Sequence, residues 1–311
     1  RCIDTEIDRR SINPFKDMKL LGTYRKMLDE IRPDLVITYS IKPNIYMGSV
    51  CKAKSVPYVT NVQGLGTAFE KPVLSNVVSV MYRSALRKAR AVFFENEENA
   101  RFFLHKNIIS AQQMKVLPGA GINLDEYPYV PRQDDGVCCF LFVGRIMKEK
   151  GVDEFFAAAK TIKAEFGKKV VFDVVGFYED AYRETVDQLV ADGVISFHGF
   201  QTDMHPFYAM ASCVVLPSYH EGMSNVLLEG AATGRALITS DIPGCREAVE
   251  DGVSGYLCPT KDVDALCDAM RRFAELPENR QAEMGRRGRT RMEQKFSKAA
   301  VVAETIKHLE I

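Results

Sequence analysis

Two glutamates eight residues apart, Glu221 and Glu229, stand on either side of a turn with the features of a phosphate site. An apolar run before Glu221 predicts a buried strand. Ser224 or Asn225, both good N-cap residues, predicts the start of a helix that carries Glu229. Gly222 lets backbone approach a ligand closely, and the free N–H groups at a helix start suit a phosphate. A carboxylate on each side can hold sugar hydroxyls, so the segment predicts a site for a sugar nucleotide.

Two cations follow a second apolar run earlier in the chain. Gly144 stands where the run from 138 to 143 ends, and Arg145 and Lys150 flank the loop that leads into an amphipathic stretch. Cations near a helix N-terminus can neutralise a diphosphate leaving group. Taken alone, each of the two segments also fits an ordinary charged loop, and only their occurrence together favours a nucleotide-sugar site.

Together the two segments resemble the nucleotide-sugar half of the retaining family-4 glycosyltransferases. The Glu–seven residues–Glu element and the Gly-Arg…Lys-Gly element occur here in that family's order and spacing. The resemblance implies that Arg145 and Lys150 stabilise the departing diphosphate. It implies further that Glu221, the third catalytic residue, holds the donor sugar and that Glu229 holds the ribose. The other donor-binding residues that we predict, with backbone near 199 reading the base, are Gly144, Gly199, Phe200, Gly222, Met223, Ser224 and Asn225.

No metal or other cofactor is expected. Asp262 and Asp264 match the Asp-x-Asp metal motif of another glycosyltransferase class, but they stand at the start of a predicted helix. There, acidic residues cap free N–H groups and complement the helix dipole. Arg145 and Lys150 already supply the positive charge that a metal would bring. His198 is interpreted as structural or as a neighbour of the base.

Apolar runs alternate with helix-like segments almost throughout, which is typical of parallel sheets covered on both faces. We therefore expect an α/β protein of the GT-B fold: two doubly wound, Rossmann-like domains facing across a cleft, with ligands at the carboxyl ends of the strands. A stretch from 128 to 136, rich in proline, charge and glycine, predicts the boundary. The predicted parts are 1–132 on the acceptor side, 133–296 for the nucleotide sugar, and a closing C-terminal helix at 297–311. The predicted strands are 35–39, 58–62, 91–95, 114–117, 138–143, 170–175, 195–198, 213–216, 236–239 and 255–258.

The first domain is expected to be incomplete. Only four strands precede the predicted boundary, and the chain begins at Arg1, in a polar stretch. The resemblance implies that roughly two strand–helix units normally come earlier, with a glycine-rich turn after the first strand. If these units are absent, a sheet edge is bare and activity is in question.

The acceptor side is predicted from two strand ends. Lys42 and Asn44 begin a helix with proline in its first turn, which makes a second anion site, and Gln63 and Gly64 form a turn after the next strand. Together they resemble the family-4 subgroup that extends polyprenyl-diphosphate-linked sugars in bacterial capsule, O-antigen and glycan assembly. Many members have a histidine where Gln63-Gly64 stands, so the usual side-chain contact to the donor sugar is expected to be missing here.

The segment 71–90 is the most membrane-like. Leu74, Val77 and Val78 fall on one helical face together with Met81 and Ala85. The arginines fall on another face, and no acidic residue occurs between 71 and 94. A basic amphipathic helix predicts contact with anionic lipid, and an ordinary helix packed on its sheet is the alternative.

Composition excludes several classes of protein. The net charge is zero, which gives no global signal for nucleic-acid binding, and no apolar run approaches the roughly 20 residues of a membrane span. Eight scattered cysteines without a Cys-x-x-Cys pair favour a reduced, cytoplasmic location. The segment 71–90 and the resemblance to enzymes with lipid-linked acceptors add the expectation of peripheral contact with the cytoplasmic face of the inner membrane.

The sequence therefore predicts a retaining transferase of a hexose or N-acetylhexosamine. The expected donor is a nucleotide diphosphate sugar, UDP-linked, and the expected acceptor is a polyprenyl-diphosphate-linked saccharide. Two alternatives stay open. A nicotinamide-dependent dehydrogenase would also have doubly wound sheets, but a Gly-x-Gly-x-x-Gly after a first strand is absent from this sequence. The second alternative is a fragment that binds nucleotide or membrane without turnover.

Overall fold

The chain folds into two compact units in the computed structural model, which describes residues 2–5, 7, 14–65, 69, 72–132, 136–179 and 181–309. Unit 1 comprises 1–119 and 302–311, and unit 2 comprises 120–301. The division differs from the predicted boundary between 132 and 133, and it also divides the last helix, α11 (Lys298–Leu309), at 301/302. Hydrogen bonds explain the difference: Ile122 N donates to Phe296 O at 2.7 Å, and Lys298 N donates to Ile122 O at 3.0 Å. These bonds attach the segment after 120 to unit 2, before the polar stretch begins.

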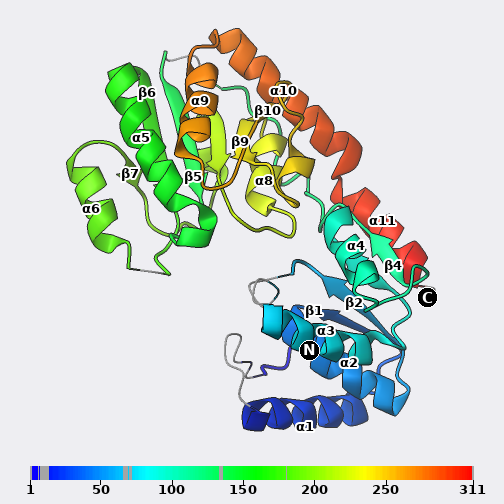
Figure 1. The fold of residues 1–311 in the computed structure, drawn as a ribbon. Helices are drawn as coiled ribbons and strands as arrows, with labels where there is room; N and C mark the ends of the chain where they lie inside the picture. The colour runs from blue at the N-terminus through cyan, green and yellow to red at the C-terminus, as the bar shows by residue number, and fades with distance from the viewer. Residues whose placement is uncertain are drawn as a thin grey trace. The chain divides into compact units, whose positions relative to one another are not determined.

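Unit 1 is built on a four-stranded parallel sheet in the order β1-β2-β3-β4, drawn in blue to blue-green in Figure 1. All four strands lie where apolar runs predicted them. Helices α1, α2 and α3 pack in sequence against one another, α1 on α2 and α2 on α3. The elements are β1 (Val36–Tyr39), β2 (Tyr58–Val62), β3 (Val92–Phe94), β4 (Met114–Val116), α1 (Pro14–Ile31), α2 (Ile41–Lys54), α3 (Pro72–Leu86) and α4 (Glu97–His105).

Unit 2 contains a six-stranded parallel sheet in the order β10-β9-β8-β5-β6-β7. The chain runs outward from β5 to β7, returns to β8, and then runs outward in the opposite direction to β10. Right-handed crossovers in opposite directions place their helices on opposite faces, and the reversal lies between β5 and β8. The strands are β5 (Cys138–Val143), β6 (Val170–Val175), β7 (Ser196–Phe197), β8 (Cys213–Leu216), β9 (Ala236–Ser240) and β10 (Gly255–Cys258).

The helices of unit 2 cover both faces of this sheet. Helix α5 packs against α9, and α8 packs against α10 (Figure 1). The strands between them are buried on both sides: all six residues of β5 and all five of β9 are buried. Burial on both faces explains the unbroken apolar sequence of β5, whereas β9 ends in the buried residues Thr239 and Ser240. The helices are α5 (Val152–Phe166), α6 (Arg183–Ala191), α7 (His205–Met210), α8 (Asn225–Ala232), α9 (Val263–Ala274) and α10 (Glu278–Lys295).

Two glycines bring neighbouring strand ends of unit 2 into close contact. A Cβ atom on Gly176, just after β6, would lie 1.8 Å from the carbonyl oxygen of Gly144, just after β5. A Cβ atom on Gly244, whose φ is +84°, would lie 2.2 Å from the carbonyl oxygen of Gly222. Only glycine allows backbones to approach this closely, so both positions fix the shape of the loops at this edge of the sheet.

Most of the apolar face of α3 that was predicted to contact a membrane is turned toward the protein core instead. Val78 and Ala85 are buried in the core of unit 1, and Leu74 and Met81 pack against that core. This side of the helix therefore packs on the core of unit 1, as in the alternative of an ordinary domain helix. Of the five apolar residues predicted on one face, Val77 alone is exposed. Residue 71 lies outside the described residues.

The described helices of both units are each too short or too polar to cross a lipid bilayer.

Candidate functional site

The reversal of strand order between β5 and β8 positions the predicted donor residues of unit 2. Adjacent parallel strands that feed helices on opposite faces leave a crevice at their carboxyl ends. The loop after β5 carries Gly144, Arg145 and Lys150, and the loop after β8 carries Glu221. The predicted cations and the first predicted carboxylate thus occur at the place where an α/β sheet offers a ligand site.

Lys150 and Glu221 are in direct contact. The Lys150 Nζ atom donates to Glu221 Oε1 at 2.6 Å, and Ser218 Oγ donates to the same oxygen at 2.8 Å. The side chains are 19% and 12% exposed, so the pair is shielded from water but still reachable. Gly151 ends the short turn that carries Lys150 with a φ of +69°, and a Cβ atom there would lie 2.0 Å from Pro217 O. The loops after β5 and β8 are therefore locked together beside the ion pair.

Arg145 is directed to a different carboxylate. Its Nη1 atom lies 2.5 Å from Glu179 Oε2, in the loop after β6, and its side chain is 45% exposed. Among the described contacts, no direct one joins Arg145 to Lys150 or Glu221. The two cations therefore stand on the same loop, and a carboxylate partner holds each of them.

The loop from 221 to 225 leads into α8 as predicted, with Ser224 as the N-cap and Asn225 as the first helical residue. Gly244 O accepts the N–H of Ser224 at 3.0 Å, so this donor is already used and the predicted phosphate cradle is reduced by one group. Met223 is buried in the core of unit 2, and Asn225 is exposed. Glu221 and Gly222, which are half-buried, and the exposed Asn225 are thus the accessible residues of this loop.

Glu229 lies one turn into α8 against two tyrosines that the sequence did not predict. Tyr208 on α7, which is fully buried, donates its hydroxyl to Glu229 Oε2 at 2.7 Å. Burial raises the pKa of Glu229, and hydrogen bonds from Tyr208 and Tyr127 partly oppose that rise. Burial, followed by the nearby Glu229 charge, raises the pKa of Tyr127 to about 12. This carboxylate is therefore held by phenol groups and has the geometry of an acceptor for hydroxyl donors.

The predicted base-reading segment lies at the ends of β6 and β7. Gly199 O accepts the N–H of Gly176 at 2.9 Å, and the exposed ring of Phe200 packs edge-on against that of Phe177, with centroids 6.0 Å apart. His198 bonds through Nε2 to Asp173 Oδ1 at 2.8 Å, which agrees with its interpretation as a structural residue.

Asp262 caps α9, as the sequence predicted. Its Oδ1 atom accepts the N–H of Ala265 at 2.9 Å. The described residues contain no cluster of three or more His, Cys, Asp or Glu side chains arranged to hold a metal ion. Independence from metal stays a prediction.

The predicted acceptor-side residues of unit 1 fall into two kinds. Lys42 Nζ donates to Asp17 Oδ1 at 2.8 Å, so a bound anion would compete with that carboxylate. Asn44 has no exposed surface, and its Nδ2 atom donates to Asn61 O at 2.9 Å. Asn44 therefore ties α2 to the end of β2 and is not placed to touch an acceptor. Gln63 is exposed and Gly64 is half-buried just beyond β2. Direct contact of Lys42, Gln63 and Gly64 with an acceptor therefore stays a prediction.

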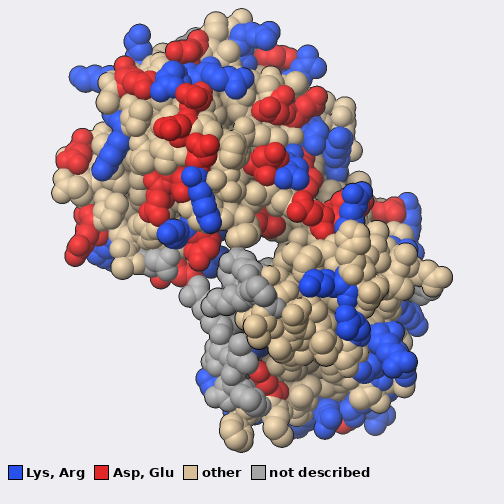
Figure 2. Space-filling view, viewed as in Figure 1, with Lys and Arg blue, Asp and Glu red and all other residues tan. Residues whose placement is uncertain are grey.

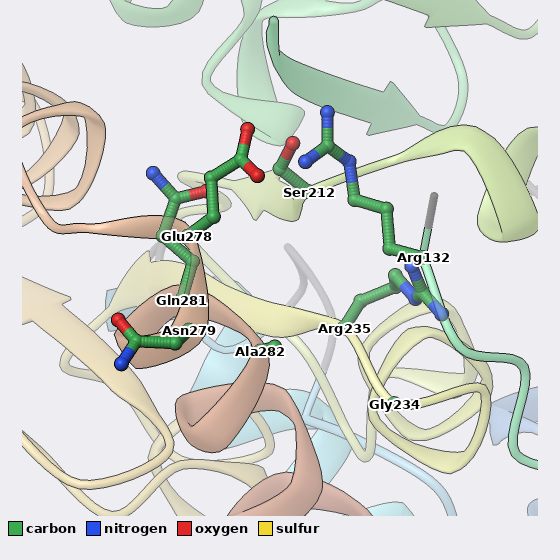
Figure 3. Close-up of a pocket in the computed structure, with 8 residues that line it drawn as sticks. All are labelled: Arg132, Ser212, Gly234, Arg235, Glu278, Asn279, Gln281 and Ala282. Atoms are coloured by element: carbon green, nitrogen blue, oxygen red, sulfur yellow. The ribbon is translucent and has the colours of Figure 1, made fainter. Parts of the chain in front are cut away.

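A cavity of about 240 Å³ lies elsewhere in unit 2, at the amino ends of β8 and β9 (Figure 3). Arg235, which is buried there, donates to the carbonyl oxygens of Ala209, Ala211 and Thr233. Its guanidinium thus joins the ends of α7 and α8 to the start of β9. The cavity is separate from the predicted donor residues, which follow the carboxyl ends of the strands. Its lining comprises Arg132, Ser212, Gly234, Arg235, Glu278, Asn279, Gln281 and Ala282.

The sequence did not predict several residues around the site, because their spacing along the chain gives no indication that they lie near Glu229. Tyr208 and Tyr127 reach Glu229 from 21 and 102 positions away in the chain, through the packing of α7 and of the segment after 120. Glycines were the one sequence signal that could have indicated the close backbone contacts around the site. Gly176 and Gly244 follow predicted strands at their carboxyl ends, where close backbone approach is common.

Two family models match the chain, one in each unit. Residues 2–96 match the model described as "Glycosyl transferase 4-like", and residues 138–275 match "Glycosyl transferases group 1". With the parallel-sheet architecture of both units, these matches show that the chain belongs to the family-4 glycosyltransferases of the GT-B fold.

Two of the curated relatives are named as transferases that act on undecaprenyl-diphosphate-linked sugars. The chain is 27% identical over 286 residues to the Campylobacter jejuni N,N'-diacetylbacillosaminyl-diphospho-undecaprenol alpha-1,3-N-acetylgalactosaminyltransferase, covering 86% of this chain and 75% of that protein. It is 26% identical to the Escherichia coli UDP-Gal:alpha-D-GlcNAc-diphosphoundecaprenol alpha-1,3-galactosyltransferase, covering 86% and 73%. The chain is therefore a glycosyltransferase related to enzymes of lipid-linked saccharide assembly.

Solved structures show the same fold. Anabaena HepE in complex with UDP and glucose superposes with a TM-score of 0.78 at 17% identity, over 96% of this chain and 84% of that one. A glycosyltransferase from Rickettsia africae gives 0.78 at 17% identity, over 98% and 84%.

Proposed function

We propose that this protein transfers a hexose or N-acetylhexosamine, with retention of configuration, from a UDP-linked donor to a polyprenyl-diphosphate-linked saccharide. The observation that carries the proposal is the Lys150–Glu221 contact at the carboxyl ends of β5 and β8. There, a cation for the diphosphate and a carboxylate for sugar hydroxyls stand side by side. The relatives named above act on lipid-linked sugars, and HepE was solved with UDP, which supports these substrate classes.

In the proposed reaction, Lys150 and Arg145 stabilise negative charge as the bond between sugar C1 and the diphosphate oxygen breaks. Glu221 fixes the donor sugar through its hydroxyls, and Glu229 holds the ribose. The acceptor hydroxyl attacks C1 from the face that the diphosphate leaves, and its proton passes to the departing phosphate oxygen. The cations supply the electrostatic stabilisation, so the proposed reaction uses no metal.

Calorimetric titration of the whole chain with UDP, GDP, ADP and NADH tests the donor site. We expect selective binding of UDP, weakened in Glu229→Ala, because the ribose loses its carboxylate partner. Glu283→Ala is the matched control, since Glu283 pairs with Arg286 and Arg287 on the surface of α10. Absence of UDP binding by a folded chain would refute the donor assignment, and binding of NADH would favour a dehydrogenase.

Turnover is tested by incubating UDP-sugars with an undecaprenyl-diphosphate-linked saccharide in detergent and assigning the anomer of the product. Arg145→Ala should lower turnover while the protein stays folded. Unchanged turnover in this variant would remove Arg145 from the mechanism. UDP binding without transfer in any donor–acceptor pair would favour the alternative of a binding fragment.

We also propose peripheral contact with an anionic membrane, at the cytoplasmic face of the inner membrane, through α3. The contact face differs from the predicted one. Val73, Val77 and Val80, at helical spacing, are 80%, 53% and 59% exposed, and Arg83 and Arg87 continue the exposed surface. Figure 2 shows that Lys and Arg outnumber Asp and Glu on the visible face of unit 1. An apolar stripe beside arginines is the pattern of an interfacial helix.

Vesicle flotation tests this contact. Replacing Val73, Val77 and Val80 together by serine should lower the fraction bound to phosphatidylglycerol vesicles. Val190, exposed on α6 of unit 2, gives a control as Val190→Ser. Equal binding of all variants, or no preference for anionic over neutral vesicles, would refute the proposal.

A further inference from the structure

His205, the first residue of α7, bonds to an oxygen atom through each of its two ring nitrogens. Nδ1 lies 2.7 Å from Asp203 Oδ1, and Nε2 lies 2.8 Å from the backbone carbonyl oxygen of Glu126. Both oxygens can only accept hydrogen bonds. A neutral imidazole has one N–H, so in either tautomer it would point a lone pair at one of the two oxygens. The protonated ring, with two N–H groups, satisfies both contacts.

The residue that His205 holds lies beside the predicted ribose carboxylate. The bond to Glu126 O fixes the backbone next to Tyr127, whose ring stacks on His205 with centroids 4.9 Å apart and an interplanar angle of 16°. The Tyr127 ring also packs edge-on against Tyr208, which donates to Glu229. His205, Tyr127, Tyr208 and Glu229 thus form one continuous chain of contacts from the surface to the site.

We propose that protonated His205 is a positioning residue for the nucleoside end of the donor site, because it holds the Glu126–Tyr127 segment against Glu229. Loss of the proton breaks one of its two hydrogen bonds and loosens that segment. Donor affinity then falls as the pH rises. The inference rests on the proposed donor role of Glu229.

The charged groups around His205 agree with this direction. Its pKa is raised by the bond to Asp203 first and then by the Glu126 carbonyl, and the charges of Asp203 and Glu126 add to the rise. The positive charge of His205 in turn acts to lower the pKa of Glu229. A raised pKa means that the bonds are complete below the ordinary imidazole value of about 6.5 and are lost as the pH rises through the higher folded value.

The test is UDP titration of the whole chain from about pH 6 to about pH 8.5 in wild type and His205→Gln. Glutamine fills part of the same space but does not titrate. His105→Gln is the matched control, because His105 is exposed at the end of α4 in unit 1. Because UDP itself titrates near pH 6, the useful quantity is the ratio of the dissociation constants of variant and wild type at each pH.

We expect His205→Gln to weaken UDP binding about fivefold at low pH, since one charge-assisted hydrogen bond is lost, and by less than about twofold at high pH. His105→Gln should give a ratio near one throughout. An NMR titration of the His205 ring provides a second readout. By reciprocity, UDP must raise the pKa of His205 by the logarithm of the ratio between the UDP dissociation constants of wild type with neutral and with protonated His205.

The outcomes separate the two hypotheses. If wild type binds UDP, and Glu229→Ala weakens it, but the His205→Gln ratio is the same at every pH, this inference fails and the donor site stands. An unchanged pKa of His205 on UDP binding would also overturn it. If a folded wild type binds no UDP at any pH, both the inference and the proposed donor site fail.

Discussion

Replacing Glu221 by glutamine is expected to change UDP binding and sugar transfer in opposite directions. In the protein as it stands, Glu221 neutralises Lys150 across 2.6 Å. Glutamine keeps an amide oxygen that can accept from Ser218 and Lys150, but it removes the negative charge. Lys150 then has more of its charge available for a diphosphate, so UDP should bind more tightly. Transfer should fall, because the donor sugar loses its carboxylate partner.

The size of the effect follows from how far the pair is buried. Exposed ion pairs contribute about 0–1 kcal/mol, and breaking fully buried ones costs about 3–5 kcal/mol. Side-chain exposures of 19% and 12% place this pair between those limits. We take about 1–2 kcal/mol as the competition that UDP no longer meets, which corresponds to a roughly 5- to 30-fold lower dissociation constant. Salt should reduce the gain, because the pair is not fully shielded.

A double-mutant cycle provides the assay. UDP binding is measured by calorimetry in wild type, Glu221→Gln, Lys150→Met and the double variant, at low and high salt. In the Lys150→Met background, the glutamine substitution should no longer tighten binding. Glu179→Gln, which releases the more exposed Arg145, should have a smaller effect than Glu221→Gln.

Weaker or unchanged UDP binding by a folded Glu221→Gln protein would refute this reasoning. An equal gain in the Lys150→Met background would also refute it, since the gain would then not come through Lys150.

Two further predictions concern stability. Gly176→Ala should lower the free energy of unfolding by about 3 kcal/mol, because its Cβ atom would meet Gly144 O at 1.8 Å. Gly167→Ala, where φ is +59° and the space is open, should cost less; equal losses in urea unfolding would contradict the packing argument. Glu229→Gln should stabilise the protein at neutral pH but not near pH 4, since burial raises the pKa of Glu229 and the folded chain loses stability as the carboxyl ionises. Urea midpoints at both pH values check this, and a variant that is less stable than wild type at neutral pH would contradict it.

Much of the fold was predictable because strands that are buried on both faces consist of consecutive apolar residues. The apolar run 138–143 is strand β5 with the predicted ends, since both faces of that strand are covered. The start of α8 and the cap by Asp262 followed from local capping chemistry. The side of α3 that is exposed to solvent was mostly mispredicted. Its sequence shows apolar residues on more than one side, and only the neighbouring α2 and the sheet decide which of them are buried.

The sequence by itself determined the alternation of strands and helices, the residue types of the donor site and their order along the chain. The tertiary structure alone decided which of those residues meet. Lys150 and Glu221 touch across 71 positions because β5 pairs with β8. Arg145 pairs with Glu179, and Tyr208 of α7 donates a hydrogen bond to Glu229 of α8. Local hydrogen bonding and hydrophobic periodicity act between near neighbours and can be read from consecutive residues. Contacts between distant residues depend on strand order and helix packing, which exist only in the folded chain.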